Sequence, residues 1–72
     1  ETLDLPDYIA YRNGDEIVVR NIPESATVSA YSLTGTVLAR EKVSDGTFRI
    51  STVQPCIIRI VSEKKTSVFK ML

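Results

Sequence analysis

The amino-acid sequence predicts an all-β domain in which about seven short strands form two packed antiparallel sheets. Apolar and polar residues alternate in several segments, and β-branched residues are dense, which favours strands over helices. Turn residues recur at intervals of roughly 8–12 residues, the spacing typical of sandwiches and small barrels. No long helical pattern competes, and parallel strands would usually need helical crossovers. We therefore expect antiparallel sheets, which bury their apolar faces by packing against each other.

The first half of the chain contains strand candidates that are separated by clear turn signals. They are residues 8–11, 15–20, 26–31 and 36–43. Asn13-Gly14 predicts a hairpin between the first two, because both residues tolerate positive φ. Pro23 breaks the pattern within residues 21–25, since proline cannot donate to a sheet ladder. Leu33-Thr34-Gly35 predicts the next turn, with Gly35 free to take a left-handed conformation.

The second half continues with strands at residues 47–51, 56–61 and 66–72. Ser44-Asp45-Gly46 is a strong turn signal before the first of them, and Val53-Gln54-Pro55 separates it from the second. Residues 56–61 form the most apolar stretch of the chain. Such a run predicts a central strand that is covered on both faces. A polar turn at residues 62–65 leads into the final strand.

Length and charge restrict the classes of function. The chain has 72 residues, which is enough for one domain spanning residues 1–72 with a single core. A core of this size rarely supplies more than about 3–5 kcal/mol of stability. Lys+Arg and Asp+Glu are balanced at 9 each, so the net charge indicates no basic face and no nucleic-acid partner. No apolar run approaches the ~20 residues of a membrane span, and no signal-peptide pattern is present.

A local excess of positive charge lies near the end of the chain, at Lys64, Lys65 and Lys70. A short cluster of this kind is most often a solvated edge. The alternative is a basic patch that contacts an anionic surface or a partner protein. These three lysines are therefore the candidate partner surface, and we expect them to face one exposed surface near the final strand.

Residues suited to catalysis or to cofactor binding are scarce. The chain has no His, and triad-type nucleophilic catalysis needs a base beside the nucleophile. Cys56 is the single cysteine, and its apolar surroundings predict a buried thiol with a raised pKa. Asp15 and Glu16 would point to opposite faces of a strand, so they cannot easily share one site. The sequence predicts no catalytic residues, no metal site and no cofactor.

Two further groups of side chains have a functional and a purely structural interpretation. Asp4 and Asp7 form a second carboxylate pair, for which a solvated, mobile segment near a chain end is the simpler interpretation. Tyr8, Tyr11 and Tyr31 could stack on apolar sugar faces as a binding platform. The alternative is that they are ordinary half-buried strand tyrosines.

One segment also resembles a known family signature. Residues 26–38 read ATVSAYSLTGTVL, similar to the V-x-V-Y-D-L-T-G-R-L-V motif of type IX (Por) secretion system C-terminal sorting domains in Bacteroidota. Later segments follow the same order. Residues 45–51 (DGTFRIS) resemble the family's N-G-x-x-x-I-S/D strand, and residues 56–61 (CIIRIV) resemble G-V-Y-I-V-R-V. Lys64, Lys65 and Lys70 match a lysine-bearing terminal strand. The resemblance covers roughly residues 14–72.

This resemblance implies a seven-stranded immunoglobulin-like sandwich that forms the C-terminal module of a larger exported protein. The module would direct its cargo through the secretion machinery to the cell surface, with the periplasm as the transit compartment. Leu33, Thr34 and Gly35 would form the family-motif turn. The alternative expectation is an accessory protein-binding, glycan-binding or spacer module without a sorting role. A stand-alone protein that pairs its edge strand with a partner is a third possibility. A monomer is the favoured oligomeric state, although the edge-pairing alternative would need a partner strand.

Overall fold

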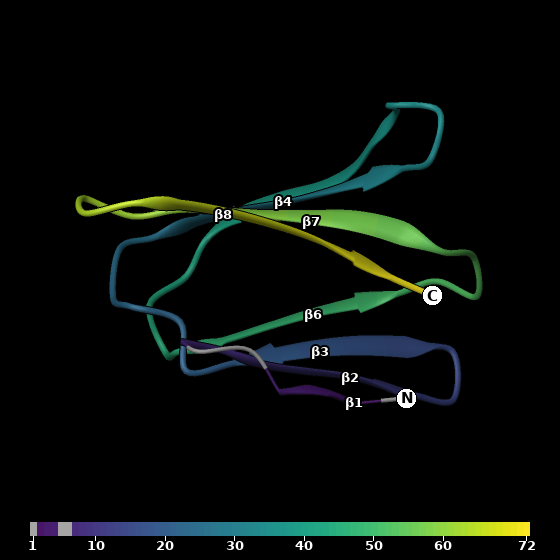
Figure 1. Cartoon of the computed structure of the whole chain (residues 1–72), viewed down its shortest axis with the longest axis horizontal. Coiled ribbons are helices and arrows are strands. Elements are labelled where there is room, and N and C mark those ends of the chain that lie inside the picture. Colours follow the sequence, from purple (N-terminus) through teal and green to yellow (C-terminus); the bar gives the residue numbers. More distant parts are fainter. Residues whose placement is uncertain (1, 5–6) are drawn as a thin grey trace.

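The computed structural model describes residues 2–4 and 7–72, with side chains described from Asp7 onward, and shows two β-sheets packed face to face (Figure 1). The strands are β1 (Thr2–Asp4), β2 (Ile9–Asn13), β3 (Glu16–Arg20), β4 (Thr27–Ser32), β5 (Val37–Lys42), β6 (Thr47–Ser51), β7 (Cys56–Val61) and β8 (Thr66–Met71). One sheet has the order β1-β2-β3-β6 and the other β5-β4-β7-β8. Every strand pairing is antiparallel, and the described residues contain no helix. The predicted all-β antiparallel sandwich is therefore confirmed.

Each of the predicted strands is present, and one short strand was not predicted. β1 pairs with β2 through backbone partners such as Asp4 and Ile9. Asp4 therefore lies in a paired strand, whereas the mobility expected of the segment between Asp4 and Asp7 stays a prediction, because residues 5–6 lie outside the described residues. Three residues are too few to display a period of two, so the sequence pattern alone could not reveal this edge strand.

The strand order is that of an immunoglobulin-like sandwich. When β2 to β8 are numbered as its successive strands, the first, second and fifth share one sheet, and the third, sixth and seventh share the other. The fourth strand, β5, pairs with β4, whereas constant-type immunoglobulin domains place this strand in the opposite sheet. The four-stranded sheet that results has a broad outer face.

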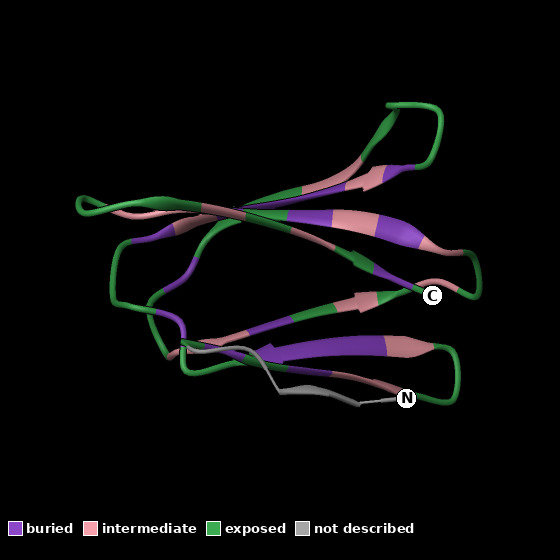
Figure 2. Cartoon of the chain, in the orientation of Figure 1, coloured by how far each residue is buried: buried purple, intermediate pink, exposed green. Residues whose placement is uncertain are grey.

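The core lies between the sheets and is built mainly from alternate residues of β3, β4 and β7, with single buried residues from β2, β6 and β8 (Figure 2). Its largest fully buried members are Phe48, Ile17, Ile58, Ile60, Met71, Val19, Val28 and Cys56. The prediction that β7 is covered on both faces was wrong. Ile57 and Val61 are only partly buried on its outer face, and Arg59 is exposed there. β7 is nevertheless central in its sheet, between β4 and β8.

β3 is the strand with consecutive buried residues. Ile17 and Val19 point into the core, whereas Val18 is fully buried but does not belong to the core cluster. Val18 lies on the outer face of its sheet, where Tyr11 and Arg49 are its cross-strand neighbours. Long side chains of this kind cover apolar surface with their stems. Val18 is therefore a buried apolar position on the outer face of this sheet.

The first hairpin is displaced by one residue from the predicted turn. Asn13 still pairs with Glu16, so the loop is Gly14-Asp15 and only Gly14 has a positive φ, of 66°. Glycine at the first loop position is the requirement of a type II′ turn. The hairpin was therefore predicted correctly, and the position of its turn was not.

Two connections cross side by side from one sheet to the other at the left of Figure 1. They are the β3–β4 and β5–β6 segments, which share main-chain hydrogen bonds. Ser25 N donates to Val43 O at 2.9 Å, and Ile22 N donates to Gly46 O at 3.1 Å. Ile22, Val43 and Ala26 are buried. These paired crossings close this end of the sandwich.

Candidate functional site

The family-motif turn lies between β4 and β5 and is organised by one hydroxyl. Ser32 Oγ lies 2.9 Å from Thr34 Oγ1 and accepts a hydrogen bond from Thr36 N at 3.1 Å. Gly35 N donates to Ser32 O at 3.0 Å, and Gly35 has a φ of 96°, a conformation that favours glycine. Leu33 is 51% exposed. The turn's hydrogen bonds define the connection between the two strands.

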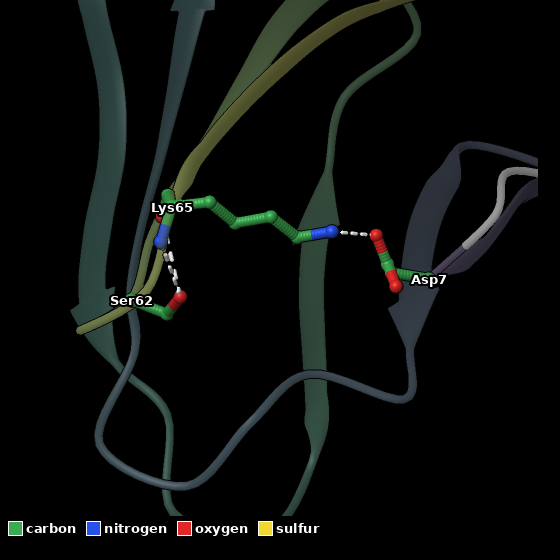
Figure 3. Close-up of polar contacts among 3 residues, drawn as sticks. All are labelled: Asp7, Ser62 and Lys65. Atoms are coloured by element: carbon green, nitrogen blue, oxygen red, sulfur yellow. Dashed lines mark hydrogen bonds and ion pairs between the residues drawn. The ribbon is translucent and has the colours of Figure 1, made fainter.

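The three candidate lysines do not form one compact cluster. Lys65 belongs to the β7–β8 hairpin, and its ammonium makes an ion pair with Asp7 just before β2 (Figure 3). Its own backbone is held by Ser62, whose Oγ accepts from Lys65 N at 3.3 Å. Lys64 is exposed in the same hairpin, whereas Lys70 lies opposite Ile57 on the outer face of β8. Lys65 and Lys70 are therefore separated by roughly 16 Å along an extended chain.

Arg12 forms a second link between the sheets, at the opposite end of the sandwich from Lys65. It follows Ala10 on the inward face of β2, and its guanidinium donates to three main-chain carbonyls. Nε reaches Leu72 O at 2.9 Å, and Nη2 reaches Gln54 O at 3.0 Å. The remaining donor, Nη1, binds Thr52 O. This arginine clamp, which was not predicted, joins β2 to the β6–β7 loop and to the residue after β8.

The outer face of the β5-β4-β7-β8 sheet carries a segregated positive charge. The residues that the register places there are Val37, Arg40, Lys42, Thr27, Ser29, Tyr31, Ile57, Arg59, Val61, Thr66, Val68 and Lys70. We call this set the basic face, because it includes four cationic residues and no carboxylate. The balanced total charge therefore conceals an uneven distribution. Sequence reasoning missed it because the strands that contribute these cations are adjacent only in the folded sheet.

A polar cluster occupies the centre of the basic face. Ser29 is 3% exposed and lies between Arg40 and Arg59 in the register. Arg40 Nε donates to Ser29 Oγ at 3.1 Å, and Arg40 Nη2 lies 3.5 Å from the Tyr31 hydroxyl. Hydrogen bonding to Arg40 is the main cause that lowers the pKa of Tyr31, followed by Ser29, and Arg59 makes the smallest contribution. Arg40 therefore joins Ser29 and Tyr31 into one polar cluster.

The three tyrosines do not form a sugar-binding platform. Tyr8 is buried in the core, Tyr11 lies on the outer face of β2, and Tyr31 lies on the outer face of the other sheet. The interpretation of a shared aromatic face was wrong, because strand alternation and the separation of the two sheets direct the rings to different surfaces.

Cys56 is buried, as predicted, and burial raises its pKa above the ordinary value of 9.0, with a smaller opposing influence from Arg12. Below the pKa of the unfolded chain the thiol is protonated in both states, so its contribution to stability is fully present. That contribution is lost as the pH rises through the higher folded-state pKa, because only the unfolded chain ionises readily.

We therefore expect a pH-dependent difference between the wild-type chain and Cys56→Ala. The advantage of the wild type in free energy of unfolding should shrink as the pH rises above about 9. Urea titrations of both proteins on either side of that pH would measure it, and the other titrating groups cancel in the difference. A difference that stays constant across this range would contradict the burial of the thiol.

No group of acidic, His or Cys side chains suited to holding a metal ion occurs among the described residues. The same part of the chain contains no helix long and apolar enough to cross a membrane. Comparison with known protein families, characterised proteins and solved structures finds no match to the chain. The strand order defines the class of the fold, a small immunoglobulin-like β-sandwich.

Proposed function

We propose that the chain is a non-catalytic C-terminal sorting domain that directs an exported protein to the cell surface through a type IX secretion system. The observation that carries this proposal is the order of its family-like segments. Residues 26–38 include β4, the motif turn and the first residues of β5, and the later matching segments coincide with β6, β7 and β8. An accessory module without a sorting role would share the fold but would not need this ordered set of motifs.

The physical requirements of the proposal are modest. A sorting domain acts as a recognisable folded tag, so it needs a stable shell and exposed recognition residues but no reactive groups. Lys64 and Lys70 are exposed on different parts of the β7–β8 unit. Lys65 makes its ion pair with Asp7, so we assign it to holding the hairpin against β2. The recognition role of the lysines is thus assigned to Lys64 and Lys70.

A reporter fusion tests the proposal. Residues 1–72 would be fused behind a signal peptide and a periplasmic reporter in a host with a working type IX system. We expect the reporter at the cell surface, and in the periplasm when the secretion apparatus is deleted. Retention of a folded, protease-resistant fusion in the periplasm of the competent host would end the proposal.

Matched charge reversals locate the recognition surface. Lys64→Glu combined with Lys70→Glu should reduce surface display, because both side chains are exposed and their replacement leaves the core intact. Arg20→Glu combined with Lys42→Glu makes the same change in net charge away from the β7–β8 unit, at two exposed residues outside the ion pairs of the described residues, and should leave display near the level of the unmodified fusion. Equal display by both double variants would remove the role of the lysines.

A further inference from the structure

The basic face exposes its positive charge without compensation from carboxylates on the same face. Arg40, Arg59, Lys42 and Lys70 are all exposed. The ion pairs among the described residues join Arg49 to Glu16 and Lys65 to Asp7, and neither involves a cation of the basic face. Like charges gathered on one face repel each other, and an anionic partner would relieve that repulsion. The face is therefore electrostatically complementary to an acidic ligand.

Apolar side chains share the basic face with these cations. Val68 is 60% exposed and Val37 is 50% exposed, whereas Ile57 and Val61 are partly buried. A polysaccharide or a nucleic acid carries anionic groups but few aliphatic groups that could cover these valine and isoleucine side chains. A protein segment can supply both carboxylates and aliphatic groups. Arginine and tyrosine are also the residue types enriched at the centres of protein interfaces.

The two arginines have a spacing that suits paired acidic side chains. Arg40 and Arg59 flank Ser29 in one cross-strand row, so their Cα atoms are two strand spacings apart, about 10 Å. Arg40 is held in place by Ser29 and Tyr31, which reduces the ordering cost when it binds a ligand. Guanidinium groups bind carboxylates in bidentate geometry. The row therefore presents a partly preorganised pair of carboxylate receptors.

We propose that the basic face docks an acidic segment of a partner protein, with carboxylates on Arg40 and Arg59 and aliphatic side chains against Val68 and Ile57. Lys42 and Lys70 extend the positive field at diagonally opposite corners of the face and steer the approach. This docking does not depend on the sorting role, because it uses the outer face of a folded sheet whether or not the chain directs export.

Fluorescence anisotropy with the purified chain tests the docking. The probe is a short labelled peptide in which pairs of glutamates alternate with single leucines, and the reference is the same peptide with glutamine in place of glutamate. We expect saturable binding of the acidic peptide that weakens as salt rises, and no binding of the reference. Arg40→Gln combined with Arg59→Gln should weaken binding at least about 10-fold.

The control is Arg20→Gln combined with Arg49→Gln, which removes the same charge from the opposite sheet. It should bind the acidic peptide within about 2-fold of the wild type, and circular dichroism would verify that both double variants are folded. Equal weakening by the two double variants would overturn the proposal. So would binding of a heparin oligosaccharide or of single-stranded DNA as tight as that of the acidic peptide, since this would identify a general polyanion surface.

Discussion

Replacing Arg12 with methionine should lower the free energy of unfolding by about 2–3 kcal/mol. The guanidinium binds the carbonyls of Leu72, Thr52 and Gln54, so its loss removes three charge-assisted hydrogen bonds at once. Water can partly replace them because this end of the sandwich is only part-buried, which keeps the loss below the sum of three separate bonds. Against a total stability of about 3–5 kcal/mol, the expected effect is severe. Urea unfolding monitored by circular dichroism would measure it.

Lys65→Met is the matched control for the arginine clamp, since it also removes one cation that links the two sheets. Its ion pair with Asp7 is about half exposed on both sides and should be worth less than about 1 kcal/mol. Arg12→Lys should recover only part of the loss, because an ammonium cannot reproduce the fixed fork of donors. Equal losses from Arg12→Met and Lys65→Met would show that the clamp does not hold the sandwich together.

Strand periodicity was sufficient to predict most of this fold. β6 and β7 have the predicted bounds, and the other predicted strands differ by one or two residues at their ends. Alternation of apolar and polar residues is a local property of the sequence. It therefore predicts that a segment forms a strand, but not which sheet the strand joins or which strands it pairs with. β7 illustrates this difference, because its apolar sequence predicted two covered faces and its outer face is partly open. Val18 shows the converse, since it lies on the outer face of its sheet and is nevertheless fully buried beside its cross-strand neighbours.

The candidate surfaces were less accessible to sequence reasoning for the same reason. Arg40 and Arg59 are far apart in the chain, and only the pairing of β4 with both β5 and β7 brings them to one row. Arg12 stands two residues after the buried Ala10, so strand alternation places this charged residue on the inward face of β2. The sequence could not identify its carbonyl partners, because they belong to distant segments. The motif turn is the opposite case. Its hydrogen bonds all lie within residues 32–36, so its sequence was enough to predict it.

Phe48→Ala should have the largest effect of any single core change and leave the chain mostly unfolded. Phe48 is 1% exposed and belongs to the core cluster, where it projects from β6 beside Val19. Truncation of a buried phenylalanine costs about 3–5 kcal/mol, which equals the whole stability expected of so small a core. The amide NMR spectrum should lose its chemical-shift dispersion, and a urea titration should no longer show a cooperative unfolding transition.

Phe69→Ala provides the comparison, because it makes the same chemical change at a ring that is only partly buried against the core. Less apolar surface returns to water and a smaller cavity forms, so we expect a loss of about 1–2 kcal/mol and a chain that stays folded. Phe48→Leu should fall in the same range, since it keeps an apolar side chain in the site. Similar losses from Phe48→Ala and Phe69→Ala would mean that stability does not depend on the layer between the sheets. In that case the paired crossings and the arginine clamp would have to supply most of it.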